Sequence, residues 1–223
     1  MQTTSRLWII LKTLGDIIET EVEHIFKPDF VNKCDAVKIE PMANFQPERY
    51  LGTWYEQAHV KEFDIFQPGD SKCIEAKYTA NGDGTFKVSN TYQNGKLSSI
   101  SEEELGKQST SWGSFGLSKR KGVTLHGKCN KEGEAAQCYV SFGDKSPEVS
   151  NYNIISTDYD NYTIVYDCKE NAQQQIIWIL SRKPVMDESV LIKMMTIIHE
   201  KIPNFNPKHF DGITYQGSKC TYE

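Results

Sequence analysis

The chain has 223 residues and a formal net charge of −5, with 25% charged and 38% hydrophobic residues. This composition is typical of a soluble globular protein, since a disordered chain carries fewer apolar residues and a membrane-spanning one carries fewer charges. The acidic balance gives no reason to expect nucleic-acid binding, which requires a basic face.

The first segment of the chain predicts a helix. Apolar residues recur with helical spacing over residues 7–26, so we expect an amphipathic helix that can contact a protein partner or a membrane surface. The apolar run at 7–11 is shorter than the core of an ordinary export signal, and the Thr- and Ser-rich start is weakly similar to a mitochondrial presequence. We therefore divide the chain into an N-terminal helix and linker at 1–32 and one domain at 33–223.

The middle of the chain predicts antiparallel strands. Apolar and polar residues alternate through short segments, and two of these segments are joined by the turn Asn81-Gly82-Asp83-Gly84, whose residues tolerate a positive φ. The expected strands are 52–61, 72–80, 85–93, 137–142, 152–157, 162–168 and 175–183. Between 97 and 136 the pattern is poor, and we interpret it as a solvated insertion around one or two strands, with Lys119-Arg120-Lys121 in a loop.

A helix is predicted after the last strand. Apolar residues recur with helical spacing over 187–202, Asp187 is the expected N-cap, and Pro203 ends the segment. Many short strands joined by hairpins, followed by one helix, indicate an all-β protein with an up-and-down barrel.

The six cysteines indicate disulfides more than metal binding. None forms a Cys-x-x-Cys pair, and the five histidines do not cluster around them, so neither a metal nor a cofactor is expected. Three disulfides in an oxidising compartment are the favoured interpretation, and six buried thiols in the cytosol are the alternative. Cys129 and Cys138 lie nine residues apart and can staple a hairpin.

Three short motifs carry a resemblance to a known family. Gly52-Thr53-Trp54 opens the first strand, Thr157-Asp158-Tyr159 forms a turn before 162–168, and Arg182 follows the last strand. In this order the motifs resemble those of the lipocalins, and most of all the group that contains apolipoprotein D, over about residues 33–220. The resemblance implies an eight-stranded antiparallel barrel whose closed end is plugged by Trp54 beneath Arg182. Gly52, Trp54, Thr157, Asp158, Tyr159 and Arg182 then have structural roles.

The resemblance also implies a disulfide pattern. In the apolipoprotein D group one disulfide joins the lead-in to the seventh strand, and another joins the second strand to the C-terminal tail. Matching positions here give Cys34–Cys168 and Cys73–Cys220, which leaves Cys129 and Cys138 as an additional pair. The N-terminal helix, the insertion after Gln93 and the unconvincing export signal depart from the family pattern.

Alternation along the strands predicts the inner face of the barrel. Aliphatic and aromatic walls with a few polar tips suit an apolar ligand that carries one polar group. Ile74, Phe86 and Leu180 are expected to face inward, together with ten residues expected to contact a ligand: Ala58, Ala76, Tyr78, Val88, Asn90, Tyr92, Val140, Phe142, Tyr166 and Trp178.

The predicted function is non-covalent binding or transport of a small hydrophobic ligand, of the fatty acid, lipid, retinoid or sterol class. An enzyme is not expected, because Glu56 alone in an apolar interior is no mechanism and no nucleophile with its base is recognisable. The alternative is a structural accessory subunit of a larger, membrane-bound, mitochondrial assembly. The disulfides place the protein outside the cytosol, either in the extracellular space or in the mitochondrial intermembrane space.

Overall fold

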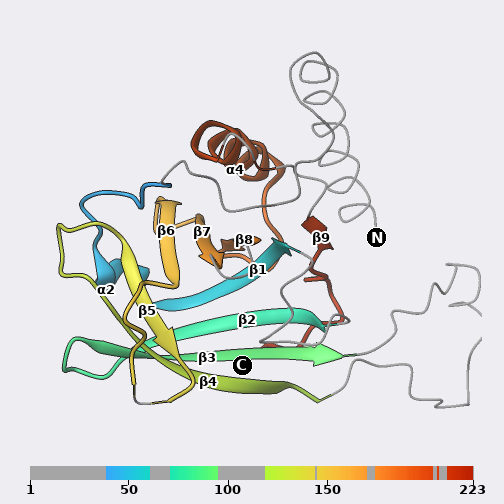
Figure 1. Cartoon of the computed structure of the whole chain (residues 1–223). Coiled ribbons are helices and arrows are strands. Elements are labelled where there is room, and N and C mark those ends of the chain that lie inside the picture. The colour runs from blue at the N-terminus through green and yellow to red at the C-terminus, as the bar shows by residue number, and fades with distance from the viewer. Residues whose placement is uncertain are drawn as a thin grey trace, which may run out of the picture.

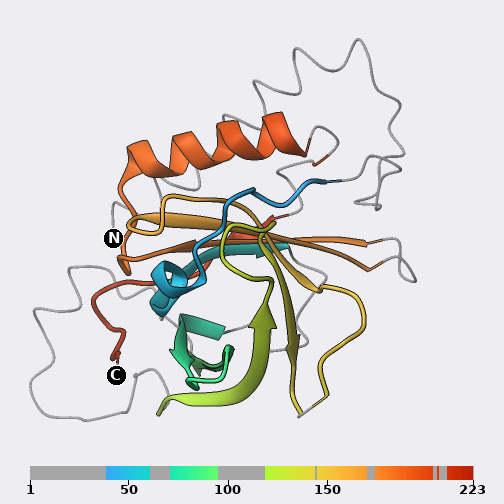
Figure 2. The same ribbon diagram turned by 90° about the vertical axis from the view of Figure 1, so that its left-hand side faces the viewer.

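A computed structural model describes residues 39–60, 71–94, 119–143, 145–169, 174–202, 205 and 210–222. Its strands form an antiparallel barrel, in which each strand from β1 to β7 pairs with the next and β1 also pairs with β8 (Figures 1 and 2). The strands are β1 Gly52–Val60, β2 Ser71–Ala80, β3 Thr85–Asn94, β4 Lys121–Cys129, β5 Gln137–Ser141, β6 Tyr152–Thr157, β7 Tyr162–Lys169, β8 Gln174–Ser181 and β9 Phe210–Ile213. The predicted fold class, an eight-stranded antiparallel barrel with a C-terminal helix, is confirmed.

Strand β1 closes the barrel and also pairs with a ninth strand. Its first half, Gly52 to Tyr55, pairs with β2, whereas Ala58 and Val60 pair with β9. Between these halves the register against β8 shifts, because Glu56 pairs with Leu180 and Ala58 with Ile179. Gln57 is therefore the extra residue of a β-bulge, which turns the following side chains to the other face of the sheet.

Helix α4, Glu188–Lys201, lies along the outside of the barrel over β7 (Figures 1 and 2). Its buried face, Leu191, Met194, Met195 and Ile198, packs against the outward side chains Ile164, Ile177 and Ile179. A separate cluster around Trp54, Tyr78 and Leu125 lies in the interior of the barrel. The strands under α4 are thus apolar on both faces.

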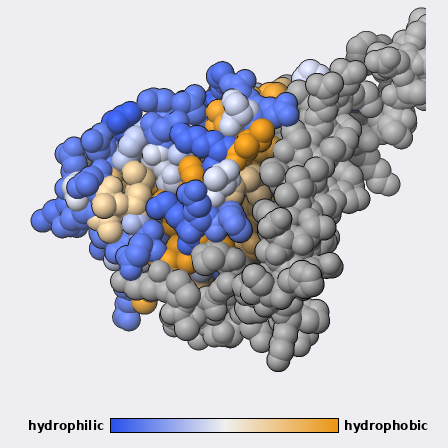
Figure 3. Space-filling model, turned by 90° about the horizontal axis from the view of Figure 1, so that it is seen from above, coloured by the Kyte–Doolittle hydropathy of each residue, from blue (hydrophilic) through white to orange (hydrophobic). Residues whose placement is uncertain are grey.

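The expected helix is confirmed, but its predicted cap is not. Asp187 occupies the N-cap position without a side-chain hydrogen bond to the first turn, and its carboxylate instead lies 3.0 Å from the ammonium of Lys183. The ammonium of Lys183, four residues earlier in the chain, therefore competes with the free N–H groups of the first helical turn for the carboxylate of Asp187. Where the chain is described, the side of the molecule seen in Figure 3 is largely hydrophilic with smaller hydrophobic areas.

Two strands were not predicted at their positions. β4 falls in the region interpreted as a solvated insertion, and β9 follows α4. The prediction of a solvated loop at 119–121 is wrong for Arg120, whose side chain is 8% exposed and lies 3.3 Å from the buried carboxylate of Glu75. A buried carboxylate on β2 requires a compensating cation, and the guanidinium of Arg120 provides it by lying against the sheet.

The N-terminal helix expected at 7–26 lies outside the described residues, so the division at residue 32 stays a prediction. Within the described ranges no helix is both long enough and apolar enough to cross a membrane.

Candidate functional site

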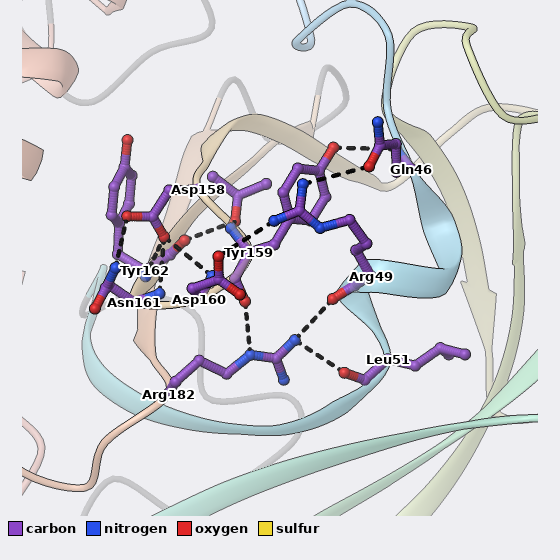
Figure 4. A network of polar contacts seen from close by, with 10 residues as sticks. Gln46, Arg49, Leu51, Asp158, Tyr159, Asp160, Asn161, Tyr162 and Arg182 are labelled. Carbon is purple, nitrogen blue, oxygen red and sulfur yellow. Dashed lines mark hydrogen bonds and ion pairs between the residues drawn. The ribbon is translucent and has the colours of Figure 1, made fainter.

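The closed end of the barrel is held by Arg182. Its guanidinium carbon lies 3.7 Å from the centroid of the Trp54 ring, and Trp54 is fully buried. The guanidinium also donates hydrogen bonds to five backbone carbonyls, those of Arg49, Tyr50, Leu51, Thr53 and Tyr159, at 2.8–3.3 Å. Figure 4 shows those to Arg49, Leu51 and Tyr159. One side chain therefore ties α2, Pro47–Tyr50, and the start of β1 to the turn between β6 and β7.

Gly52 is required at its place beside this guanidinium. Its φ is +94°, a conformation that L side chains rarely adopt, and a Cβ atom there would lie 3.3 Å from Nη1 of Arg182. The first motif thus provides the indole of the plug and the space for the arginine that covers it.

The turn between β6 and β7 is held by its own side chains. Oδ1 of Asp158 accepts hydrogen bonds from the backbone N–H groups of Asp160, Asn161 and Tyr162, and Thr157 Oγ1 donates to the carbonyl of Tyr162 (Figure 4). Partial burial acts against ionisation of Asp158, but the hydrogen bonds outweigh it and lower the pKa of that carboxyl. Tyr159, at φ +67°, points its hydroxyl to the backbone N–H of Gln46.

Three tyrosines lie between this plug and the hollow part of the barrel. The hydroxyl of Tyr152 lies 2.8 Å from that of Tyr50 and 2.7 Å from that of Tyr78. Burial raises the pKa of Tyr50 to about 12 and holds the pKa values of Tyr78 and Tyr152 well above the ordinary value. All three phenols stay protonated in the physiological range, so they form a neutral polar floor.

A cavity of about 80 Å³ lies inside the barrel above this floor. Its walls are mainly aliphatic and aromatic, and the ring of Trp178 stacks on Tyr152 with 6.3 Å between centroids. The volume is enough for several water molecules, or for a short apolar segment, and lies below the roughly 300–1,000 Å³ of ordinary ligand pockets.

Three polar side chains face the cavity besides the tyrosines. Glu56 is buried, and its Oε1 accepts hydrogen bonds from Thr214 Oγ1 and from the ring of His59, each at 2.8 Å. Asn151 exchanges two hydrogen bonds of 2.8 Å with the backbone of Val140. Asn90 lies on β3, and its buried Oδ1 accepts no hydrogen bond in the described part of the chain.

Six of the ten residues expected to contact a ligand line this cavity: Ala76, Tyr78, Val88, Asn90, Val140 and Trp178. They come from β2, β3, β5 and β8, where alternation is uninterrupted at these positions. Contact with a ligand remains a prediction for each of them.

The inward orientation expected for Ala58 and Tyr166 is wrong. Both belong to the outer cluster beneath α4. Ala58 follows the bulge at Gln57, which moves it to the outer face. Tyr166 lies on the same face of β7 as Tyr162 and Ile164, and α4 covers this outer face. Because the outer face is therefore apolar as well, an apolar side chain on β7 does not indicate an inward orientation.

Phe142 and Tyr92 do not reach the cavity either. Phe142 follows the end of β5 and is 55% exposed, since the strand stops at Ser141. Tyr92 pairs with Lys121 near the end of β3 and is half-buried outside the lining. Inward parity places a side chain in the cavity only where neighbouring strands enclose it.

Three lining residues were not predicted as part of the inner wall: Leu125, Asn151 and Tyr152, whereas Glu56 lies in the interior as expected. Alternation of Val123, Leu125 and Gly127 with Thr124 and His126 is a strand signal that could have placed Leu125. Glu56 shares parity with Trp54, which is a usable signal on β1 before the bulge.

Disulfides fasten the barrel at two described places. Cys129–Cys138 joins directly paired residues of β4 and β5, and Cys73–Cys220 ties the C-terminal tail to β2, both as expected. Cys168 is also disulfide-bonded. Its expected partner, Cys34, lies outside the described residues, so that pairing stays a prediction.

A second hollow of about 370 Å³ lies at the closed end, between α2 and the hairpins β2–β3 and β4–β5. Tyr78 and Tyr152 line both hollows and so separate them.

Comparison with known proteins agrees with this geometry. A family model described as a lipocalin-like domain matches residues 45–208. The chain is 26% identical to apolipoprotein D of Mus musculus over 193 residues, which cover 85% of this chain and 86% of the relative. It is 31% identical to the Lazarillo protein of Schistocerca americana over 62% of this chain and 56% of the relative. The structure of insecticyanin from Manduca sexta superposes with a TM-score of 0.58 at 16% identity, covering 85% of this chain and 91% of that one. Because the family model spans well over half of its residues, the chain belongs to the lipocalin family.

Proposed function

We propose that this protein binds a small hydrophobic ligand non-covalently inside its barrel. The observation that supports the proposal is the apolar cavity above the tyrosine floor, enclosed by β2, β3, β5 and β8 and sealed below by Trp54 and Arg182. Membership of the lipocalin family agrees with it. The barrel acts as a container, and its motif residues build the container without contacting the cargo.

The volume of the cavity bounds the affinity. A hollow of about 80 Å³ encloses a ring or a short chain segment more readily than a complete fatty acyl chain. Four or five buried methylenes at roughly 0.8 kcal/mol each give about 3–4 kcal/mol before the cost of association. We therefore expect a Kd of about 1 mM or weaker for ligands that occupy only this hollow.

We propose binding without catalysis. Each cysteine in the described ranges is held in a disulfide, so none of those provides a thiolate nucleophile. Glu56 faces the cavity as a single carboxylate, and its hydrogen bonds to Thr214 and His59 fix its orientation instead of preparing a nucleophile.

The disulfides indicate an oxidising compartment. We propose the extracellular space within that class, and nothing in the structure supports the mitochondrial location. An interaction of residues 7–26 with a protein partner or membrane surface stays a prediction outside the described part. The accessory-subunit hypothesis is not favoured, because it gives no reason for an enclosed apolar cavity with polar groups.

A cavity-filling variant tests the proposal. Full-length protein is titrated with 1-decanol while its tryptophan fluorescence is followed, because Trp178 lies in the cavity wall. We expect a saturable change of tryptophan fluorescence in the wild type. Ala76→Phe should bind 1-decanol at least about tenfold more weakly, because the introduced phenyl ring occupies the cavity.

Lys77→Phe is the matched control, since Lys77 is the next residue of β2 and is exposed on the other face. It should bind like the wild type. Equal affinity in Ala76→Phe and Lys77→Phe, with both proteins folded by circular dichroism, would contradict binding in this cavity.

A further inference from the structure

We infer that the barrel selects apolar ligands whose polar end donates a hydrogen bond, as an alcohol or an ammonium group does, over ligands that end in a carboxylate. The inference rests on the proposed function and specifies the chemistry of the same cavity. It follows from the kinds of polar atoms that the wall presents.

The charge of the wall is the first argument. Of the twelve described residues that line the cavity, none is Lys, Arg or His, and the only ionisable carboxyl group is that of Glu56. Its oxygens accept hydrogen bonds from His59 and Thr214, so this group presents acceptors and no donor N–H to the cavity. An incoming carboxylate would therefore meet another carboxyl group, and no lining cation would compensate its charge in a low-dielectric interior.

An unsatisfied acceptor is the second argument. Oδ1 of Asn90 is buried and accepts no hydrogen bond from any described residue, although nearly all buried polar atoms in proteins have a partner. Asn90 lies on β3 between Ala76 of β2 and Val123 of β4, and its side chain lines the cavity. A donor on the ligand satisfies this oxygen, whereas a carboxylate, which has no hydrogen to donate, cannot.

The tyrosine hydroxyls and the amide of Asn151 are the third argument, because these donors already have partners. The hydroxyls of Tyr78 and Tyr152 bond to each other, and Asn151 donates to the carbonyl of Val140 while its own Oδ1 accepts from the same residue. A carboxylate ligand would have to break one of these hydrogen bonds to gain a donor from these three side chains. An alcohol or ammonium group gains a partner without breaking any of them.

A ligand series with one chain length tests this inference. Full-length protein is titrated at pH 7 with 1-decanol, decylamine, methyl decanoate and decanoate, below the concentrations at which they aggregate, and tryptophan fluorescence is followed. We expect 1-decanol and decylamine to bind about tenfold more tightly than decanoate, and about fivefold more tightly than methyl decanoate, which accepts but does not donate. The alcohol and amine arms show whether the donor alone suffices or whether positive charge adds affinity.

Variants assign the preference to the two acceptors. Asn90→Leu should weaken binding of 1-decanol about fivefold and leave methyl decanoate unchanged, and Ser89→Leu, on the next residue of β3, should change neither. Glu56→Gln should narrow the gap between decylamine and decanoate, and Glu200→Gln, which removes an exposed charge of α4, should not. If Asn90→Leu does not fold, the pair of Glu variants decides the question.

The outcomes separate the inference from the proposed function. Saturable binding of all four ligands with equal affinity, or tightest binding of decanoate, overturns the inference and leaves the container in place. Failure of every ligand to bind removes both.

Discussion

Replacement of Arg182 by alanine should destabilise the barrel far more than loss of Arg49, the neighbouring surface charge at the same end. The guanidinium holds the closed end together, because it covers the Trp54 ring at 3.7 Å and donates to five carbonyls from two segments, residues 49–53 and the turn between β6 and β7. Without it, these carbonyls keep only weaker hydrogen bonds to water, and the indole loses its cover.

The magnitude follows from these contacts. A hydrogen bond contributes about 0.5–1.5 kcal/mol net, and half-exposure of the guanidinium favours the lower end of that range. The cation–π contact adds about 1 kcal/mol. We therefore expect Arg182→Ala to lower the free energy of unfolding by roughly 4 kcal/mol, a large part of the roughly 5–15 kcal/mol of an ordinary domain. Arg182→Lys should lose somewhat less, because it keeps the charge but cannot reach five acceptors.

Urea unfolding followed by circular dichroism measures the effect. Arg49→Ala is the matched control, because Arg49 lies at the same end and pairs with Asp160 in solvent, at 3.2 Å with side chains 50% and 76% exposed. That variant should lose less than about 1 kcal/mol. The reasoning is refuted if Arg182→Ala is no less stable than Arg49→Ala.

Two further predictions concern buried and turn-forming charges. Arg120→Met should lower the free energy of unfolding, measured in urea, by about 3–5 kcal/mol, because it leaves the Glu75 carboxylate buried without this cation. The double variant Arg120→Met/Glu75→Leu should recover part of the loss. A double variant as unstable as the single one would count against this explanation. The lowered pKa of Asp158 contributes stability that is present above the unfolded pKa and lost as pH falls through the folded value. The stability gap between wild type and Asp158→Ala should therefore be full above about pH 5 and shrink towards pH 2, and a gap that does not change with pH would disprove it.

Local sequence information determined most of the barrel. The alternating segments became strands with ends within two residues of those expected, and the turn at 81–84 formed with Gly82 and Gly84 at positive φ. The three motifs predicted the plug, since Trp54 and Arg182 meet as the resemblance implied. Eight lining residues, the six expected to contact a ligand together with Ile74 and Leu180, followed from alternation alone, because a strand with one apolar face indicates by its sequence which side is buried.

Only the tertiary structure decided the rest, for reasons that no alternation pattern contains. The bulge at Gln57 places Ala58 on the outer face. Helix α4 covers the outer face of β7, so that the face carrying Tyr166 is as apolar as an inner one. The pairing of β1 with β9 and the burial of Arg120 against Glu75 each join segments far apart in the chain. The sequence did not determine the size of the cavity either. That size depends on how the eight strands close around their side chains, and the pattern of residues names the side chains but not the space between them.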